Sequence, residues 1–504
     1  MAVLQQTFLL NFKASTKQDY LLLGISFIYL LLPSVIFLLG WLHWYIAIPV
    51  TFFLIASGIS FLKENKNLNY KPNTVSIKYI WAIMSISVIV TYYAGIGGYS
   101  GQLIDFEKHN AVLHDLIVNK WPVYYYKHQY IKEPVFLDYY LGWYLPPAFL
   151  AKITSINLTD FYCYAWSSLG LFLSLYWFLK ICGTKSWWAI FLFFFLGDLE
   201  SVYTMIRFFT KSILQWSFDW SFLLKELYLT DIIFANFSSN YACQMTQYEW
   251  APQHSLGSWI STGIILHTSY FNKNNRFVLL IGSLSLLWSP FVSIGLIPII
   301  LISVLRNFKS VFSWENCVAG ISLFLIIAAY YIAHYPQEFR WIWEMYKNSE
   351  GLYKVPLFIL VKFGFVLICI YPFIKNNKEL KPLFYTIFIS LSIIPFIYIG
   401  HQADFLMRAS SPSWNILVIL VVVSIKQISK VSSSLKYLYY ALILISCVRY
   451  SIYGKHNSEL HELYKIKVSE SNTLTNLYEY EWFNTQYFGR MESLFIEYFA
   501  KKHE

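Results

Sequence analysis

The chain has 504 residues, of which 57% are hydrophobic and only 13% are charged, whereas an ordinary soluble domain carries about a quarter charged residues. This composition excludes a soluble multidomain enzyme, and an aromatic content of 20% excludes a disordered chain. The net charge of +10 would suggest nucleic acid in a soluble protein. In a membrane protein it fits lysines in short cytoplasmic loops, so we expect the bilayer as partner and no nucleic acid.

Apolar runs long enough to cross a membrane recur along the chain. A hydrocarbon core of about 30 Å needs roughly 20 apolar helical residues. We predict about thirteen spans, at 20–41, 44–62, 79–99, 161–181, 186–206, 253–270, 277–289, 291–305, 316–334, 355–374, 382–400, 412–428 and 437–453. The short pair divided by Ser289-Pro290 could instead be one kinked helix. The sequence therefore predicts an all-α fold, a polytopic transmembrane bundle.

Basic residues occur in every second short loop, which orients the spans. If the N-terminus is cytoplasmic, the loops on its side of the membrane hold Lys63, Lys66, Lys71, Lys78, Lys180, Lys185, Lys273, Arg276, Arg306, Lys309, Lys375, Lys378, Lys381, Lys426, Lys430 and Lys436. Cytoplasmic loops carry such an excess of Lys and Arg. The outer face then receives long loops at 100–160, 207–252 and 335–354.

Three regions follow from this organisation. They are an N-terminal pair of spans (1–78), a transmembrane core (79–453) and an amphipathic C-terminal tail (454–504). The first outer loop contains IDFEKHNAVLHDLIVNK, which has an apolar side and predicts an interfacial helix. We place a second interfacial or partly inserted helix in the apolar, Pro-containing stretch DYYLGWYLPPAFLAKI.

Three polar clusters lie at span ends or in loops of the predicted outer face. Ionisable groups near a bilayer are costly to bury and are therefore functional candidates. The clusters contain Asp105, Glu107, Lys108, His109, His114 and Asp115; Glu249, Gln253 and His254; and His401, Asp404 and Arg408. We expect the three clusters to meet in one pocket.

Each cluster has a structural and a functional interpretation. Asp105 could cap a helix, or it could act with Glu107 as general base toward an acceptor hydroxyl. Gln253 and His254 follow a proline at a helix start, or they face an anionic group. Asp404 and Arg408 form an i, i+4 ion pair, or the guanidinium binds phosphate.

Motifs for other chemistry are lacking. The sequence contains no paired His or Cys spacing for zinc, no Walker A motif, no dinucleotide fingerprint and no nucleophile elbow. We therefore predict no cofactor, although a divalent cation held by carboxylates is left open.

The acidic residue after an early span, the long first outer loop and the charged later loops resemble the GT-C superfamily of membrane glycosyltransferases. The phrases DFEKHNAVLHDL from Asp105, APQH from Ala251 and DFLMRAS from Asp404 are also similar to those of uncharacterised bacterial polytopic proteins associated with that fold. The resemblance covers about residues 79–430.

The resemblance implies a GT-C-like bundle in the bacterial inner membrane with an extracytoplasmic active site. The sugar would leave a polyprenyl-phosphate carrier for a glycan, lipid or protein acceptor. Asp105 matches the acidic residue of the first outer loop, with Glu107 as substitute, and Arg408, His254 and Lys108 would hold the phosphate. The acidic pair expected in the second outer loop is not cleanly present, which leaves metal dependence open.

Two other classes compete with a transferase. A transporter or flippase would use the same polar groups to gate a path and would suit helices broken around Pro290. A membrane O-acyltransferase or polymer ligase would rely on a histidine such as His109, His114 or His254.

Overall fold

The computed structural model describes residues 17–66, 76–127, 131–199, 209–210, 212–214, 241–336, 338–345, 354–400, 404–428, single positions between 437 and 447, 466–477 and 485–502. These residues are predominantly helical, as the sequence predicts. The chain divides into two compact units, and each is described by itself. Apart from Met1, unit 1 comprises Phe178–Tyr248 and Glu338–Leu460, and unit 2 comprises Ala2–Trp177, Glu249–Gln337 and His461–Glu504.

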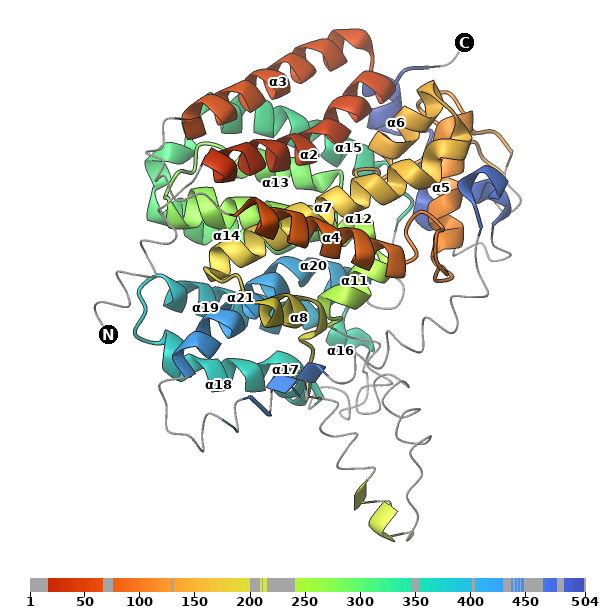
Figure 1. Ribbon diagram of the computed structural model, residues 1–504. Helices are drawn as coiled ribbons and strands as arrows, with labels where there is room; N and C mark the ends of the chain where they lie inside the picture. Colours follow the sequence, from red (N-terminus) through yellow and green to blue (C-terminus); the bar gives the residue numbers. More distant parts are fainter. Residues whose placement is uncertain are drawn as a thin grey trace. The chain divides into compact units, whose positions relative to one another are not determined.

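Unit 2 is built from helices of the N-terminal part and of the middle of the chain (Figure 1). In chain order its longer helices are α2 (Lys17–Trp41), α3 (Trp44–Lys66), α4 (Ile77–Tyr93), α5 (Phe106–Val118), α6 (Leu145–Ile153), α7 (Thr159–Cys182, whose last turn passes into unit 1), α12 (Pro252–Ile264), α13 (Val278–Leu286), α14 (Pro290–Arg306) and α15 (Ile321–Ile332). A π-helical stretch, Ile265–Phe271, continues α12, and another, Glu315–Gly320, precedes α15.

Unit 1 contains the remaining helices. They are α8 (Trp187–Phe195), most of α11 (Gln244–Trp250), α16 (Ile342–Met345), α17 (Lys354–Ile359), α18 (Phe365–Ile374), α19 (Leu380–Ile393), α20 (Asp404–Ala409) and α21 (Ser411–Ile428). A π-helical stretch, Leu360–Gly364, joins α17 to α18 without a break in the helical path. Helix α21 packs against α8, α18 and α19.

Six helical segments among the described residues are long and apolar enough to cross a membrane. They are Lys17–Trp41, Trp44–Asn65, Ile156–Cys182, Glu315–Ile332, Val355–Ile374 and Ser411–Ile428. Three shorter apolar helices, Ile77–Tyr93, Pro290–Arg306 and Leu380–Phe396, accompany them. Helix suits such segments because every backbone polar group must find its partner within the segment when water is absent. The integral-membrane character therefore has structural support, whereas the count of thirteen spans stays a prediction.

Twelve of the thirteen predicted spans are helical over at least part of their described residues. Within the predicted span 186–206, α8 ends at Phe195 and Leu196 has extended backbone. Residues 200–206 lie outside the described residues. The short pair at 277–289 and 291–305 forms two separate helices, because Ser289 is extended and its hydroxyl accepts a hydrogen bond from the amide of Val292 at 3.3 Å. Most of 437–453 lies outside the described residues.

Two small sheets correct the all-α expectation. In unit 2, β1 (Tyr124–Tyr125), β2 (Val135–Leu137) and β5 (Phe488–Arg490) form an antiparallel sheet in the order β1-β2-β5. In unit 1, β3 (Phe339–Trp341) pairs antiparallel with β4 (Ile397–Ile399). Strands of two or three residues are too short to show a period-two hydrophobic pattern, which is why the sequence did not predict them.

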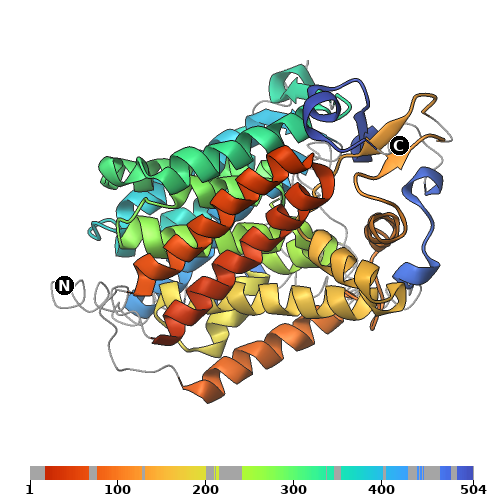
Figure 2. The same ribbon diagram turned by 90° about the horizontal axis from the view of Figure 1, so that it is seen from above.

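The C-terminal segment closes one end of unit 2. Strand β5 pairs with β2, so the last described residues are joined to the first outer loop. The Asn110 side chain donates to the carbonyl of Ile466 at 2.8 Å, and the amide of Lys501 donates to the carbonyl of Trp41 at 2.8 Å. Figure 2 shows this blue segment beside α5 and the strands of the first outer loop. In the described residues the segment consists of single helical turns and one strand.

The first outer loop forms the predicted helix, but it is covered on both sides. Helix α5 spans Phe106–Val118 and buries its apolar residues Leu113, Leu116 and Ile117. Its polar residues Lys108 and Asp115 are buried as well, because the C-terminal segment packs on α5. The second predicted helix begins only at Leu145, after a buried non-helical segment.

Candidate functional site

Asp105 stands at the start of α5, directly after the turn that follows α4. The turn needs glycine, because Gly95 and Gly97 have φ of 75° and 82°. Asp105 occupies the N-cap position, but its side chain makes no capping hydrogen bond. Its carboxylate instead accepts from Nζ of Lys108 at 2.6 Å, and the two side chains are 27% and 10% exposed. Asp105 therefore has the position of a helix cap but does not make the capping hydrogen bond. It is a partly accessible carboxylate with a cationic neighbour.

Two further residues of α5 complete this cluster. Glu107 lies in the first turn and is half-buried. His109 is fully buried: its Nδ1 lies 2.5 Å from the hydroxyl of Tyr144, and its Nε2 lies 3.1 Å from the carbonyl oxygen of Trp250. A carbonyl only accepts, so Nε2 carries the proton and the tyrosine hydroxyl donates to Nδ1 when the ring is neutral. Binding of phosphate by His109 would require one of these bonds to break.

Asp115 connects α5 to the C-terminal segment. Its buried carboxylate accepts from the hydroxyl of Tyr125 at 2.7 Å, the hydroxyl of Thr473 at 2.9 Å and the amide of Leu474 at 3.0 Å. Nδ1 of His114 lies 3.3 Å from its other oxygen. Burial, followed by the neighbouring carboxylate, raises the pKa of Tyr125 well above its usual value, so this phenol stays a donor. The structure gives Asp115 a connecting role within unit 2.

Gln253 and His254 lie in the first turn of α12, after Pro252, as the sequence predicts. Both are buried: Gln253 is 0% exposed and His254 is 3% exposed. The His254 ring meets the ring of Tyr140 edge to face, with centroids 4.8 Å apart. Tyr140 belongs to the non-helical segment before α6. The start of α12 is thus linked to the first outer loop.

The structure adds an acidic residue that the sequence analysis did not select. Asp138 is fully buried in the segment after β2, and one carboxylate oxygen lies 3.4 Å from Nδ1 of His334, just after α15. Burial raises the pKa of the Asp138 carboxyl, while His334 lowers it. In the sequence, Asp138 could have been selected because it is the one charged residue at the start of the otherwise apolar stretch DYYLGWYLPP.

Asp404 and Arg408 belong to unit 1. They form the intrahelical pair that their spacing predicts, with Arg408 Nη2 2.8 Å from Asp404 Oδ1. The side chains are 18% and 15% exposed. Phosphate binding by Arg408 stays a prediction. Because the Asp105 cluster and Gln253-His254 belong to unit 2, a pocket shared by all three clusters stays a prediction as well. Residues 401–403, including His401 of the third cluster, lie outside the described residues.

A second ion pair in unit 1 is fully buried. Nζ of Lys362 lies 2.8 Å from Oδ2 of Asp198, and neither side chain is exposed. Asp198 follows the end of α8, and Lys362 lies on the π-helical stretch inside the span 355–374. The amide of Leu199 also donates to the carbonyl of Val361 at 3.1 Å. A lysine within an apolar span is the sequence signal for this site.

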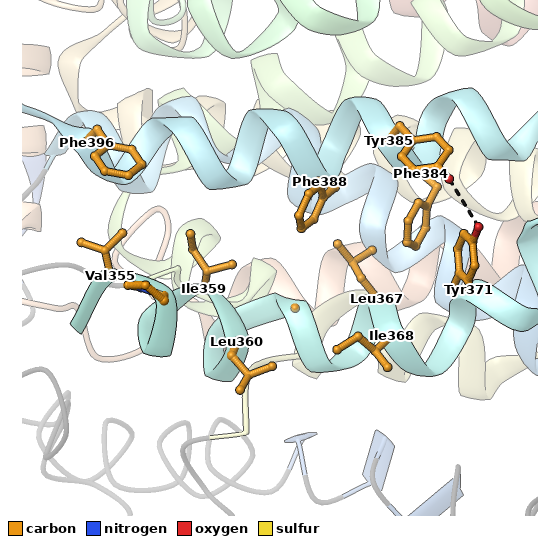
Figure 3. A pocket seen from close by; sticks show the side chains of 12 residues that line it. Val355, Ile359, Leu360, Leu367, Ile368, Tyr371, Phe384, Tyr385, Phe388 and Phe396 are labelled. Carbon is orange, nitrogen blue, oxygen red and sulfur yellow. Dashed lines mark hydrogen bonds between the residues drawn. The ribbon is translucent and has the colours of Figure 1, made fainter. Parts of the chain in front are cut away.

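Two cavities differ in chemistry. In unit 1, α17, α18 and α19 enclose about 820 Å³ lined almost entirely by apolar side chains. Figure 3 shows aromatic rings such as Phe388 facing Ile359 and Leu367 across this space, with the hydroxyls of Tyr371 and Tyr385 3.4 Å apart toward one end. In unit 2, a polar cavity of about 310 Å³ includes Glu64, Asn65, Thr268, Asn272, Lys273, Asn274, Asn307 and Ser310.

No group of three or more His, Cys, Asp or Glu side chains that could hold a metal ion occurs among the residues that the structure describes. No disulfide joins the six cysteines, all of which lie among the described residues. No family model matches the chain, and neither a curated protein nor a solved structure matches it. The case for a function therefore rests on the sequence pattern and on the geometry within each unit.

Proposed function

We propose that the chain is a membrane glycosyltransferase. It moves a sugar from a polyprenyl-phosphate carrier to a hydroxyl of a glycan, lipid or protein, on the extracytoplasmic side of a bacterial inner membrane. The six helices long enough to cross a bilayer support the membrane setting. The GT-C resemblance of the first outer loop supports the chemistry.

The proposal rests mainly on the exposure and the contacts of the Asp105 carboxylate. A carboxylate at the end of a glycine turn, about a quarter exposed and not used as a helix cap, is available to a substrate hydroxyl. The Lys108 ammonium at 2.6 Å gives the same place a cation for a lipid phosphate. A phosphate that draws Lys108 away would remove this cation from the carboxylate and make it a better proton acceptor.

The proposed reaction inverts the anomeric carbon. Asp105 takes the proton of the acceptor hydroxyl while the hydroxyl oxygen forms a bond to that carbon. The bond between the carbon and the phosphate oxygen breaks, and its electron pair leaves with the polyprenyl phosphate. Lys108 neutralises the departing phosphate. Arg408, whose planar guanidinium suits two phosphate oxygens, is proposed separately as a phosphate-binding residue of unit 1.

The test uses the full-length protein in detergent with a set of polyprenyl-phosphate sugars and hydroxyl acceptors. Asp105→Asn should lower the turnover by about 10²–10⁴-fold, the usual contribution of a general base. Arg408→Ala should lower it by about 10²–10³-fold. Glu338→Gln and Arg340→Ala are matched controls, because these residues form an exposed ion pair elsewhere in unit 1. Full activity of Asp105→Asn would refute the assignment of the base.

A transporter or flippase is the second candidate, favoured by one observation. The Lys362–Asp198 pair is completely buried and lies on a π-helical stretch of a predicted span, and ionisable residues inside spans commonly mark substrate or proton pathways. Substrate movement in sealed vesicles that is lost in Lys362→Met but retained in Asp105→Asn, without turnover of any lipid-linked sugar, would favour this candidate.

A further inference from the structure

A set of polar side chains in unit 2 is buried without full hydrogen bonding. Gln253 is 0% exposed, and neither atom of its side-chain amide has a hydrogen-bond partner within the residues that the structure describes. Asp138 is also fully buried, and its carboxylate has the ion-pair contact with His334 but no hydrogen bond of good geometry in that same part of the chain. Buried amides and carboxylates are nearly always satisfied in folded proteins.

These side chains form one neighbourhood, here named the Tyr140 cluster: Asp138, Tyr140, Gln253, His254, Tyr331 and His334. The Tyr140 ring contacts the His254 ring at 4.8 Å and the Tyr331 ring at 6.2 Å between centroids. Asp138 lies two residues before Tyr140 in the chain, and Gln253 directly precedes His254. The cluster therefore combines the first outer loop, the start of α12 and the end of α15.

The side chains of the cluster differ in their exposure to solvent. Asp138, Gln253 and His254 are buried, whereas Tyr140, Tyr331 and His334 are half-buried. The cluster thus combines the buried polar groups of Asp138 and Gln253 with aromatic rings that remain partly accessible. An unsatisfied buried amide costs free energy in the free protein, and a ligand that supplies its hydrogen bonds would recover that cost. This arrangement resembles a binding site more than a packed core.

The chemistry of the cluster selects the ligand. The Gln253 amide offers one acceptor oxygen and two N–H donors, and a carboxylate accepts from hydroxyl groups. Aromatic side chains supply the apolar surface that small-molecule sites combine with a few placed polar groups. The Asp138 carboxylate disfavours an anionic ligand. We propose that the Tyr140 cluster binds a neutral sugar residue through its hydroxyls. As the sugar subsite of the transferase, this assignment rests on the proposed function; as a binding site, it does not.

The experiment measures sugar binding by the full-length protein in detergent. The probes are glucose, galactose, mannose and N-acetylglucosamine, with glucuronate as the charged counterpart of glucose, and the readout is saturation-transfer NMR with the Kd obtained by titration. We expect at least one neutral sugar to bind and glucuronate to bind more weakly than glucose. Asp138→Asn should reduce this discrimination against glucuronate.

The variant Gln253→Leu separates binding from stability. It should weaken sugar binding by about tenfold for each hydrogen bond lost. Without sugar its melting temperature should equal or exceed that of the unsubstituted protein, because it removes a buried amide that has no partner among the described residues. The matched control is Gln102→Leu. Gln102 is buried in the same unit, donates to the carbonyl of Gly95 at 3.2 Å and accepts from Asn110 at 3.3 Å, so its loss should lower the melting temperature and leave sugar binding unchanged.

The outcomes distinguish this inference from the proposed function. Absence of binding by every sugar, or a melting temperature of Gln253→Leu as low as that of Gln102→Leu, would overturn the sugar site. Sugar binding that is sensitive to Gln253, without transfer from any lipid-linked sugar, would support the site and count against the transferase. Transfer that continues with an unchanged KM in Gln253→Leu would support the transferase and overturn the assignment of the Tyr140 cluster as its sugar subsite.

Discussion

Replacement of Asp115 by alanine should detach the C-terminal segment from α5. The buried carboxylate accepts three hydrogen bonds of 2.7–3.0 Å, from the hydroxyls of Tyr125 and Thr473 and from the amide of Leu474. A hydrogen bond to a charged group contributes about 1.5–3 kcal/mol. Alanine removes the acceptor of all three donors, two of which, the Tyr125 hydroxyl and the Leu474 amide, are buried. Substitution of one donor removes a single bond.

The expected loss is about 3–5 kcal/mol, the range found when one partner of a buried charged network is removed. This is smaller than three times the single-bond value, because bonds within one network do not add. Because residues 466–477 pack directly on α5 and contain two of the three donors to Asp115, the loss should appear first as opening of 466–477.

Limited proteolysis of the protein in detergent measures this opening. Cleavage within 466–477 should become much faster in Asp115→Ala, and the thermal midpoint should fall. Thr473→Val should have a smaller effect of about 1–2 kcal/mol, because it removes one donor and leaves the acceptor with two others.

Asp105→Ala is the matched control. It also removes a carboxylate from α5, but this carboxylate lies at the other end of the helix, is partly exposed and contacts Lys108. It should change neither readout by more than about 0.5 kcal/mol. If Asp115→Ala were cleaved and unfolded like Asp105→Ala, the idea that this carboxylate holds the C-terminal segment would be refuted.

Three other substitutions test single features. Lys362→Met should lower the free energy of unfolding by about 3–5 kcal/mol, because it removes the cation beside the buried Asp198 side chain; thermal unfolding in detergent measures this. Gly142→Ala should cost about 1–3 kcal/mol in the same assay, because a Cβ there would lie 2.8–2.9 Å from Trp288. Asp138→Asn should increasingly stabilise the protein as the pH rises above about 4, the unfolded pKa of an aspartate. Because burial raises the folded pKa of Asp138, the stability that its protonated form contributes is fully present below the unfolded pKa and is lost as the pH rises through the folded pKa.

Each of these has a control and a contrary result. The double variant Lys362→Met/Asp198→Asn should recover part of the stability lost in Lys362→Met, and no recovery would show that the two side chains act separately. Gly58→Ala should be tolerated, because its nearest neighbour is the end of the Leu31 side chain at 3.4 Å. A stability difference of Asp138→Asn that stays constant with pH would argue against a carboxyl titrating at that position.

The sequence determined the class of protein and the positions of most helices. Apolar runs predict helices because hydrocarbon demands internal backbone hydrogen bonding, and this demand is local to each segment. The same local reasoning placed α5 and the start of α12 at Pro252, and it predicted the pair between Asp404 and Arg408 from their i, i+4 spacing.

Only the tertiary structure decided which polar groups are paired and which are not. Composition gives no sign that Asp115 anchors residues more than 350 positions away, or that His334 lies beside Asp138. Hydropathy cannot predict that α8 stops at Phe195 and that Asp198 then meets Lys362. These contacts depend on burial and on distances between remote segments, and a buried polar group takes its meaning from its partners, which the linear sequence does not contain.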